Sequence, residues 1–130
     1  MTVTAALLID SVRQNEDGAV DLVGLVEGFR FPSLPVTVEE TLLFLRLALE
    51  PGDRGKSVRL GFHLLDSGGQ QRAPESLLTV KIPTEDEHPA PDATLLPQLS
   101  LTFHQSGVHR LEIRADGEPL HAFPLLVYPK

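Results

Sequence analysis

The chain has no cysteine and no tryptophan, a single tyrosine, and 11 lysine and arginine residues against 18 aspartates and glutamates. Without cysteine it has no disulfide scaffold, no thiol nucleophile and no Cys-ligated zinc site. The formal charge of −7 argues against nucleic acid or an anionic membrane as a partner, because both are bound mainly through Lys and Arg. The scarcity of aromatic residues also argues against sugar binding.

Long apolar runs are absent as well. No stretch approaches the ~18–20 apolar residues that a transmembrane helix needs. The short apolar run Ala5–Ile9 follows Met1–Thr4, and the basic start and small-residue cleavage site of a secretory signal are missing. We therefore expect a cytoplasmic protein. With 130 residues, 42% of them hydrophobic, we expect residues 1–130 to form a single domain with its own core.

What the sequence does contain is a period-two alternation of apolar residues, which places each set on one face of a strand. We expect the two most regular sets to fold back across Pro51–Lys56 and pair in a single antiparallel register. The expected facing pairs are Leu49 with Val58, Leu47 with Leu60, Leu45 with Phe62, and Leu43 with Leu64.

The segment 37–49 also has a competing interpretation. Thr37–Glu40 has the form of a helix capping box. A helical stripe would then be formed by Val38, Leu42, Leu45 and Leu49. A helix would give the following segment no reason to match it, so the facing pairs favour a strand. A helical turn near Thr37–Thr41 stays open.

Turn-forming residues separate the apolar segments along the rest of the chain. Gly24 and Gly28 lie inside one of these segments, which indicates a bulge or a close approach of two backbones. Repeated short strands with hairpin turns predict an all-β fold, an antiparallel β-sandwich of about eight strands, immunoglobulin-like, with little or no helix. The expected strands are 2–13, 19–31, 37–49, 57–66, 76–83, 95–104, 108–115 and a last one that ends at Tyr128.

Two turns near the end of the chain set expected registers. A three-residue turn at Gln105–Gly107, with Gly107 at positive φ, would place Phe103 opposite His109. Asp116-Gly117 is a strong two-residue hairpin signal, which would place Ile113 opposite Leu120.

The last strand is apolar on both faces. In the register set by Asp116-Gly117, Phe123, Leu125 and Val127 share the face opposite Leu120 and Ala122. Such a strand is either central and covered on both faces, or part of an exposed patch that a partner covers. Phe123, Leu125 and Val127 are therefore our candidate interface residues.

No constellation of residues points to catalysis or metal binding. His104 and His109 straddle a turn but have opposite strand parity, so they cannot ligate one ion. The acidic segment Glu85–Asp92 offers oxygen ligands, but prolines stand where a calcium loop has glycine. A nucleophile elbow and a full phosphate loop are both missing. We predict no catalytic, cofactor-binding or metal-binding residues, and no cofactor.

Several strand and turn signatures resemble a family of small bacterial β-sandwich proteins of unknown function. They are Ala6–Asp10 through Glu16–Gly18, Leu22–Gly24, Pro32–Pro35, Gly107–Ile113, Asp116-Gly117 and Pro124-Leu125. The resemblance covers most of the chain and implies a compact β-sandwich without a characterised activity or site residues. The closing hairpin is also similar to the last strands of immunoglobulin-like domains, at the level of fold.

We therefore expect a non-enzymatic protein-interaction or structural module. Its partner would be another protein or a second copy of the chain, and a homodimer through a sheet face or edge is the simplest case. The alternative is a β-sandwich that binds a small ligand or metal at the mouth between its sheets, near the acidic 84–93 loop.

Overall fold

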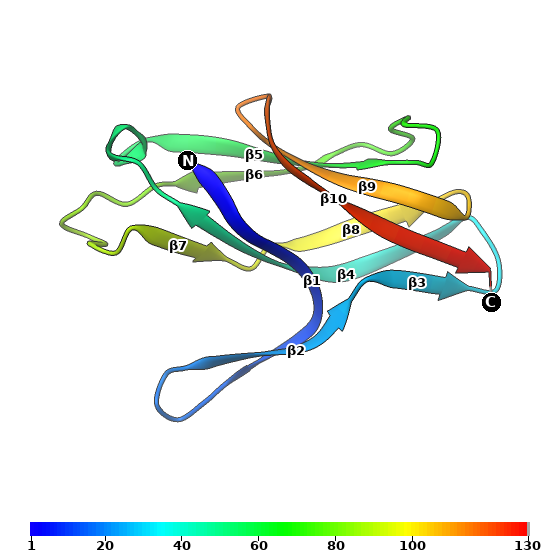
Figure 1. The fold of residues 1–130 in the computed structure, drawn as a ribbon, viewed down its shortest axis with the longest axis horizontal. Coiled ribbons are helices and arrows are strands. Elements are labelled where there is room, and N and C mark those ends of the chain that lie inside the picture. Colours follow the sequence, from blue (N-terminus) through cyan, green and yellow to red (C-terminus); the bar gives the residue numbers. More distant parts are fainter. Residues whose placement is uncertain (130) are drawn as a thin grey trace.

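The computed structural model describes residues 1–129, which form two β-sheets with a core between them (Figure 1). In chain order the strands are β1 (Thr2–Gln14), β2 (Val20–Val26), β3 (Gly28–Phe31), β4 (Val36–Ala48), β5 (Ser57–Leu65), β6 (Ser76–Lys81), β7 (Asp92–Leu95), β8 (Gln98–Phe103), β9 (Gly107–Ala115) and β10 (Glu118–Pro129), with a short 3₁₀ helix η1 (Pro51–Asp53) after β4.

The sheets have five strands each. Sheet A has the order β2-β1-β4, and both β7 and β8 pair with the far side of β4. Sheet B has the order β3-β10-β9-β5-β6. Every pairing is antiparallel except that of β3 with β10, which is parallel. The predicted all-β architecture of mostly antiparallel strands in two layers is confirmed.

Residues 1–129 form ten strands instead of about eight. The expected strand 19–31 is divided at Glu27, because the chain crosses there from sheet A into sheet B. A further short strand, β7, forms at the end of the expected acidic loop. No helix among residues 1–129 is long and apolar enough to cross a membrane.

The core is built from the inward faces that period-two alternation predicts. Leu43, Leu45 and Leu47 of β4 and Val58, Leu60 and Phe62 of β5 are all buried. In β8 the residues Leu99, Leu101 and Phe103 are buried, and the Phe103 ring contacts the rings of Phe29 and Phe31.

The expected hairpin of the two leucine-rich strands is wrong, although both are strands. β4 pairs with β1, so that Leu45 lies opposite Ala6, whereas β5 pairs with β6 and β9. The two apolar stripes belong to different sheets, and both contribute to the one core cluster between the sheets. The apolar face of a strand is buried equally well against a strand of the opposite sheet and beside a strand of the same sheet. Alternation alone therefore does not predict which of the two arrangements forms.

The registers expected around two other segments are also corrected. β8 pairs with β4 and β9 with β5 and β10, so Phe103 and His109 are not paired across a hairpin, although Gly107 does have the predicted positive φ of 120°. The segment Thr37–Thr41 is extended and forms no helical turn, and its register opposite β8 shifts between Val38 and Thr41.

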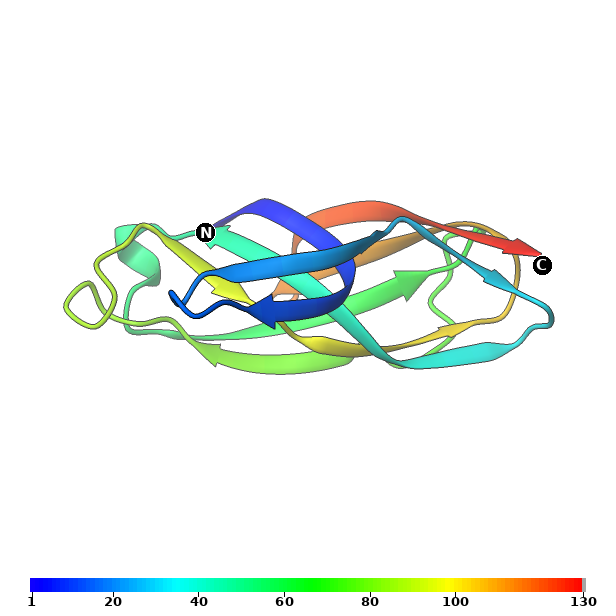
Figure 2. The same ribbon diagram turned by 90° about the horizontal axis from the view of Figure 1, so that it is seen from below.

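The β1–β2 hairpin bends over the outer face of sheet A (Figure 2). Gly24 has a φ of 75° at this bend, and a Cβ there would lie 2.8 Å from Cβ of Asp10. Beyond it, Val20 and Leu22 line a cleft together with Phe44 of β4, whose side chain points away from the core. Glycine is therefore required at position 24 by its positive φ and by the Asp10 side chain, and the β1–β2 register does not shift there, so the predicted bulge is not found at Gly24.

Candidate functional site

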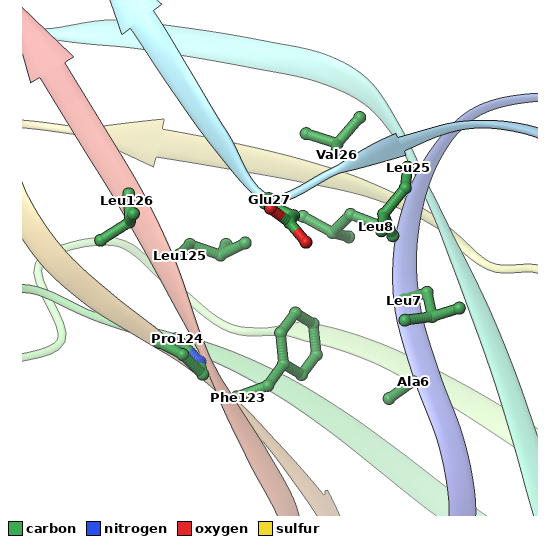
Figure 3. A pocket seen from close by; sticks show the side chains of 10 residues that line it. All are labelled: Ala6, Leu7, Leu8, Leu25, Val26, Glu27, Phe123, Pro124, Leu125 and Leu126. Carbon is green, nitrogen blue, oxygen red and sulfur yellow. The ribbon is translucent and has the colours of Figure 1, made fainter.

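A groove lies between β1 of sheet A and β10 of sheet B, at one margin of the sandwich (Figure 3). Its volume is about 380 Å³, and it is lined by Ala6–Leu8, Leu25–Glu27 and Phe123–Leu126. Leu7 and Leu25 are 39% and 57% exposed, so this apolar lining is open to solvent. We call this feature the β1–β10 groove.

Two strand edges border the β1–β10 groove. β1 pairs with β4 from Thr2 to Ile9 but with β2 only from Leu8 onward, so Thr2–Leu7 has a strand neighbour on one side only within residues 1–129. β10 pairs with β9 from Glu118 to Val127 but with β3 only from Leu126 onward. An unpaired strand edge presents backbone N–H and C=O groups that another chain can bind.

The two edges are not equivalent as templates. β10 contains Pro119 and Pro124, which have no N–H to donate. Thr2–Leu7 of β1 contains no proline, although its pairing with β4 shifts register between Val3 and Ala5. Every residue of this β1 edge therefore has a backbone N–H group, which is not true of the β10 edge.

One end of the groove is closed where the chain crosses between the sheets. The backbone N–H of Leu126 donates to the carbonyl oxygen of Glu27 at 3.3 Å. A Cβ on Gly28 would lie 2.7 Å from the carbonyl oxygen of Leu126, so only glycine allows β3 to approach β10 this closely. Gly28 thus makes the close approach of backbones that its position predicted.

Glu27 gives this end of the groove a negative charge. Its carboxylate points into the gap between β1 and β10 (Figure 3). Among the described residues that line the groove, Glu27 is the one with a charged side chain, and the others are apolar. The sequence pattern did not identify Glu27, although the flanking pair Gly24 and Gly28 was a usable signal that the chain turns sharply there.

The candidate interface residues of β10 lie on the opposite face from the one expected. The Asp116-Gly117 turn forms as predicted, but a bulge between Pro119 and His121 shifts the register by one residue. Phe123 therefore lies opposite Leu111 and faces inward.

Their burial follows from this shift. Leu125 and Val127 are 1% and 2% exposed and belong to the core, so the exposed-patch interpretation does not hold for them in the single chain. Phe123 is half-buried, and both it and Leu125 line the β1–β10 groove.

His104 and His109, which were predicted to point to opposite faces of their strands, differ in burial. His109 is 1% exposed, contacts the Phe103 ring edge-on and donates from Nδ1 to the carbonyl oxygen of Gly107 at 3.3 Å. His104 is exposed. No group of three or more histidine, aspartate or glutamate side chains within residues 1–129 is placed to hold a metal ion.

Two of the carboxylates in the acidic 84–93 loop, those of Glu87 and Asp92, bond to the protein itself. Glu87 accepts hydrogen bonds from the backbone and hydroxyl of Thr84, which hold the pKa of its carboxyl below the usual range. Asp92 pairs with Arg46 at 3.3 Å, and Nε2 of His88 donates to the Asp92 carbonyl. The mouth between the sheets beside this loop is a cavity of about 230 Å³, lined in part by Lys81 and His88.

Comparison with known proteins finds one family and a distant fold likeness. The model of a family of unknown function, DUF6941, matches residues 4–128. No curated protein matches the chain in sequence. A solved structure of Pseudomonas fluorescens alkylpurine DNA glycosylase AlkC, bound to DNA containing an abasic site analog, is similar at 9% identity with a TM-score of 0.45.

That likeness covers 78% of this chain and 28% of the other, so the chain spans less than a third of the length of the structure it matches. At this level of similarity it carries no argument about function.

Proposed function

The chain belongs to the DUF6941 family, a family of unknown function, and we propose that it is a non-enzymatic protein-interaction module that binds an extended apolar segment of a partner protein in the β1–β10 groove. The observation that carries this proposal is the unpaired Thr2–Leu7 edge of β1 beside an open apolar groove.

The groove has the two properties that strand addition needs. The β1 edge offers backbone hydrogen bonds, which supply affinity, and the apolar walls offer space for alternate side chains, which supplies specificity. Leu7, Leu25 and Phe123 come from β1, β2 and β10, so an added strand would contact side chains of both sheets. Its other side chains would point away from the groove.

The negative charge in the groove indicates which residues the partner segment carries. Glu27 is negative, and the chain as a whole carries −7. A lysine or arginine on the incoming segment would complement Glu27, whereas an acidic residue there would be repelled. The proposed partner segment is therefore extended, apolar at alternate positions and basic at the end that lies beside Glu27.

Two observations favour this groove over the alternative at the acidic loop. The carboxylates of Glu87 and Asp92 already bond to Thr84 and Arg46, so both would have to exchange partners to bind a cation. The groove requires no such exchange, because its walls are apolar apart from Glu27 and the strand edge beside it has no partner among residues 1–129.

A random peptide library displayed on phage tests the proposal. We expect selection on the wild-type protein to enrich peptides with apolar residues at alternate positions and one lysine or arginine. Synthetic versions should bind Glu27→Lys at least about tenfold more weakly, or ~1.4 kcal/mol, because like charges then meet at the end of the groove. The matched control is Glu118→Lys, which makes the same charge change at an exposed position of β10 outside the groove lining.

Three results would contradict the proposal. The library could enrich no such motif, or the selected peptides could bind Glu27→Lys as well as wild type. Light scattering could instead show a wild-type dimer that Glu27→Lys dissociates, in which case the groove holds a second copy of the chain and not a partner segment.

A further inference from the structure

A second hollow lies on the outer face of sheet B and is centred on Gly61. The outward positions of β5 are Arg59, Gly61 and His63, and Gly61 is flanked in register by Arg114 of β9 and Leu77 of β6. The hollow has a volume of about 500 Å³, and its lining combines charged and apolar groups. It belongs to a different surface from the β1–β10 groove, which lies at the free edge of β10.

The missing side chain of Gly61 is what opens this hollow. A Cβ at this position would lie 2.9 Å from Nε2 of His63 and 3.5 Å from Cδ2 of Leu77. The φ of Gly61 lies outside the positive range that favours glycine, so the backbone alone does not demand this residue. The glycine therefore serves to leave space in front of the His63 ring.

The hydrogen bonds around His63 fix which of its nitrogens carries the proton. Nε2 of Gln71 donates to the carbonyl oxygen of Ala73 and to Oε2 of Glu75, both at 3.1 Å. This turns Oε1 of Gln71 toward Nδ1 of His63, at 2.9 Å. Because an amide oxygen can only accept, Nδ1 carries the hydrogen.

It follows that the lone pair of neutral His63 is on Nε2, which faces the hollow and has no hydrogen-bond partner among residues 1–129. His63 is only 8% exposed, so its ring is held in place by its surroundings. The chain Glu75–Gln71–His63 thus presents one oriented acceptor to the hollow.

The walls carry charges of both signs. Arg59 makes no ion pair within the described residues, and Arg114 is paired with Glu112. Asp116 also lines the hollow, and its Oδ1 accepts a hydrogen bond from the backbone N–H of Arg59 at 3.0 Å. Hydrogen bonds from its own backbone N–H and from Gln71 hold the pKa of the Glu75 carboxyl below the usual range, so it is ionised at neutral pH. Leu77, 57% exposed, adds an apolar wall.

From these observations we infer that the hollow binds a small zwitterion of the α-amino-acid class with an apolar side chain. The ligand carboxylate would lie against the guanidinium of Arg59, its ammonium would donate to Nε2 of His63 and face Glu75, and its side chain would contact Leu77. A ligand with only one of the two charges would leave part of this lining unmatched.

L-leucine is the probe that tests the inference, because its analogues each remove one charge at nearly constant shape. Isocaproate lacks the ammonium and leucinamide lacks the carboxylate. We expect millimolar L-leucine to shift the ring nitrogen and hydrogen NMR signals of His63 saturably. Both analogues should bind at least about tenfold more weakly, which is ~1.4 kcal/mol.

Variants locate the binding. Gly61→Ala should abolish the L-leucine shift, since its Cβ would displace the His63 ring. Ser57→Ala, on the same face of β5 but outside the hollow, should leave the shift unchanged. The absence of a saturable shift in the wild-type protein, equal binding of either analogue, or full binding by a folded Gly61→Ala protein would each overturn the inference.

Discussion

At the scale of single residues, Asp66 shows how one carboxylate organises a turn of this fold. Its Oδ1 accepts hydrogen bonds from the backbone N–H groups of Gly68 and Gln70, both at 2.9 Å, and its Oδ2 accepts one from Nε of Arg72 at 2.6 Å. The backbone bond from Gln70 has the largest effect in holding the pKa of this carboxyl below its usual value. Asp66 therefore stabilises the end of β5 as a charged group.

The pH dependence of this stabilisation is testable with Asp66→Asn. A carboxyl whose pKa is lower in the folded state contributes stability above its unfolded pKa, about 3.9 for aspartate, and loses it as the pH falls through the folded value. We expect the variant to have a lower urea midpoint than wild type at pH 7, and the difference to shrink as the pH falls below about 4.

Urea denaturation at a series of pH values measures this, with Glu85→Gln in the exposed loop as the control. A difference between Asp66→Asn and wild type that stays constant from neutral to acid pH would show that the charge of Asp66 does not matter.

At the scale of elements, Gly28 lies at the crossing from β2 to β3, where glycine is required for steric reasons and not for its backbone conformation. Gly28 needs no positive φ, but a Cβ there would lie 2.7 Å from a backbone oxygen of β10, which cannot move aside as a flexible side chain would. Gly28→Ala must therefore push β3 away from β10, next to Glu27.

We expect Gly28→Ala to lower the free energy of unfolding by about 1–3 kcal/mol, the usual cost of forcing an extra group into a packed site. Gly52→Ala is the matched control, because a Cβ at Gly52 meets nothing within 4 Å, and it should stay within about 0.5 kcal/mol of wild type. Urea denaturation of both variants measures the difference. Equal stability of the two variants would refute the steric role of Gly28.

Elements also show what the sequence can and cannot predict. Alternation identifies the inward faces of β4, β5, β6 and β8, because burial imposes a period of two on every strand with one wet face. It does not identify strand partners, since Leu45 is buried equally well whether Phe62 lies beside it or across the core.

The candidate site was less predictable than the fold for a related reason. A single bulge in β10 inverts the faces of everything that follows it, and so Leu125 and Val127 enter the core. Nothing in the alternation of apolar residues predicts that bulge. The groove itself needs three segments far apart in sequence, of which only the glycines around Glu27 gave any local signal.

At the scale of the whole molecule, the crossing of the chain between sheets explains why the sandwich has an unpaired margin. The chain leaves sheet A after β2, and β3 pairs with the last part of β10 in sheet B, so β2 and β3 together join the two sheets at one end of this margin. At the other end β1 and β10 keep edges without a second neighbour among residues 1–129. The β1–β10 groove is the consequence of this topology.

Residue-resolved amide hydrogen exchange, measured by NMR with and without a library-selected peptide, tests the binding mode most directly. Strand addition at the β1 edge predicts that those amides of Thr2–Leu7 that do not bond to β4 exchange at least about tenfold more slowly when the peptide is bound, because each gains a backbone hydrogen bond. Unchanged exchange along Thr2–Leu7, with protection appearing on another surface, would contradict the account.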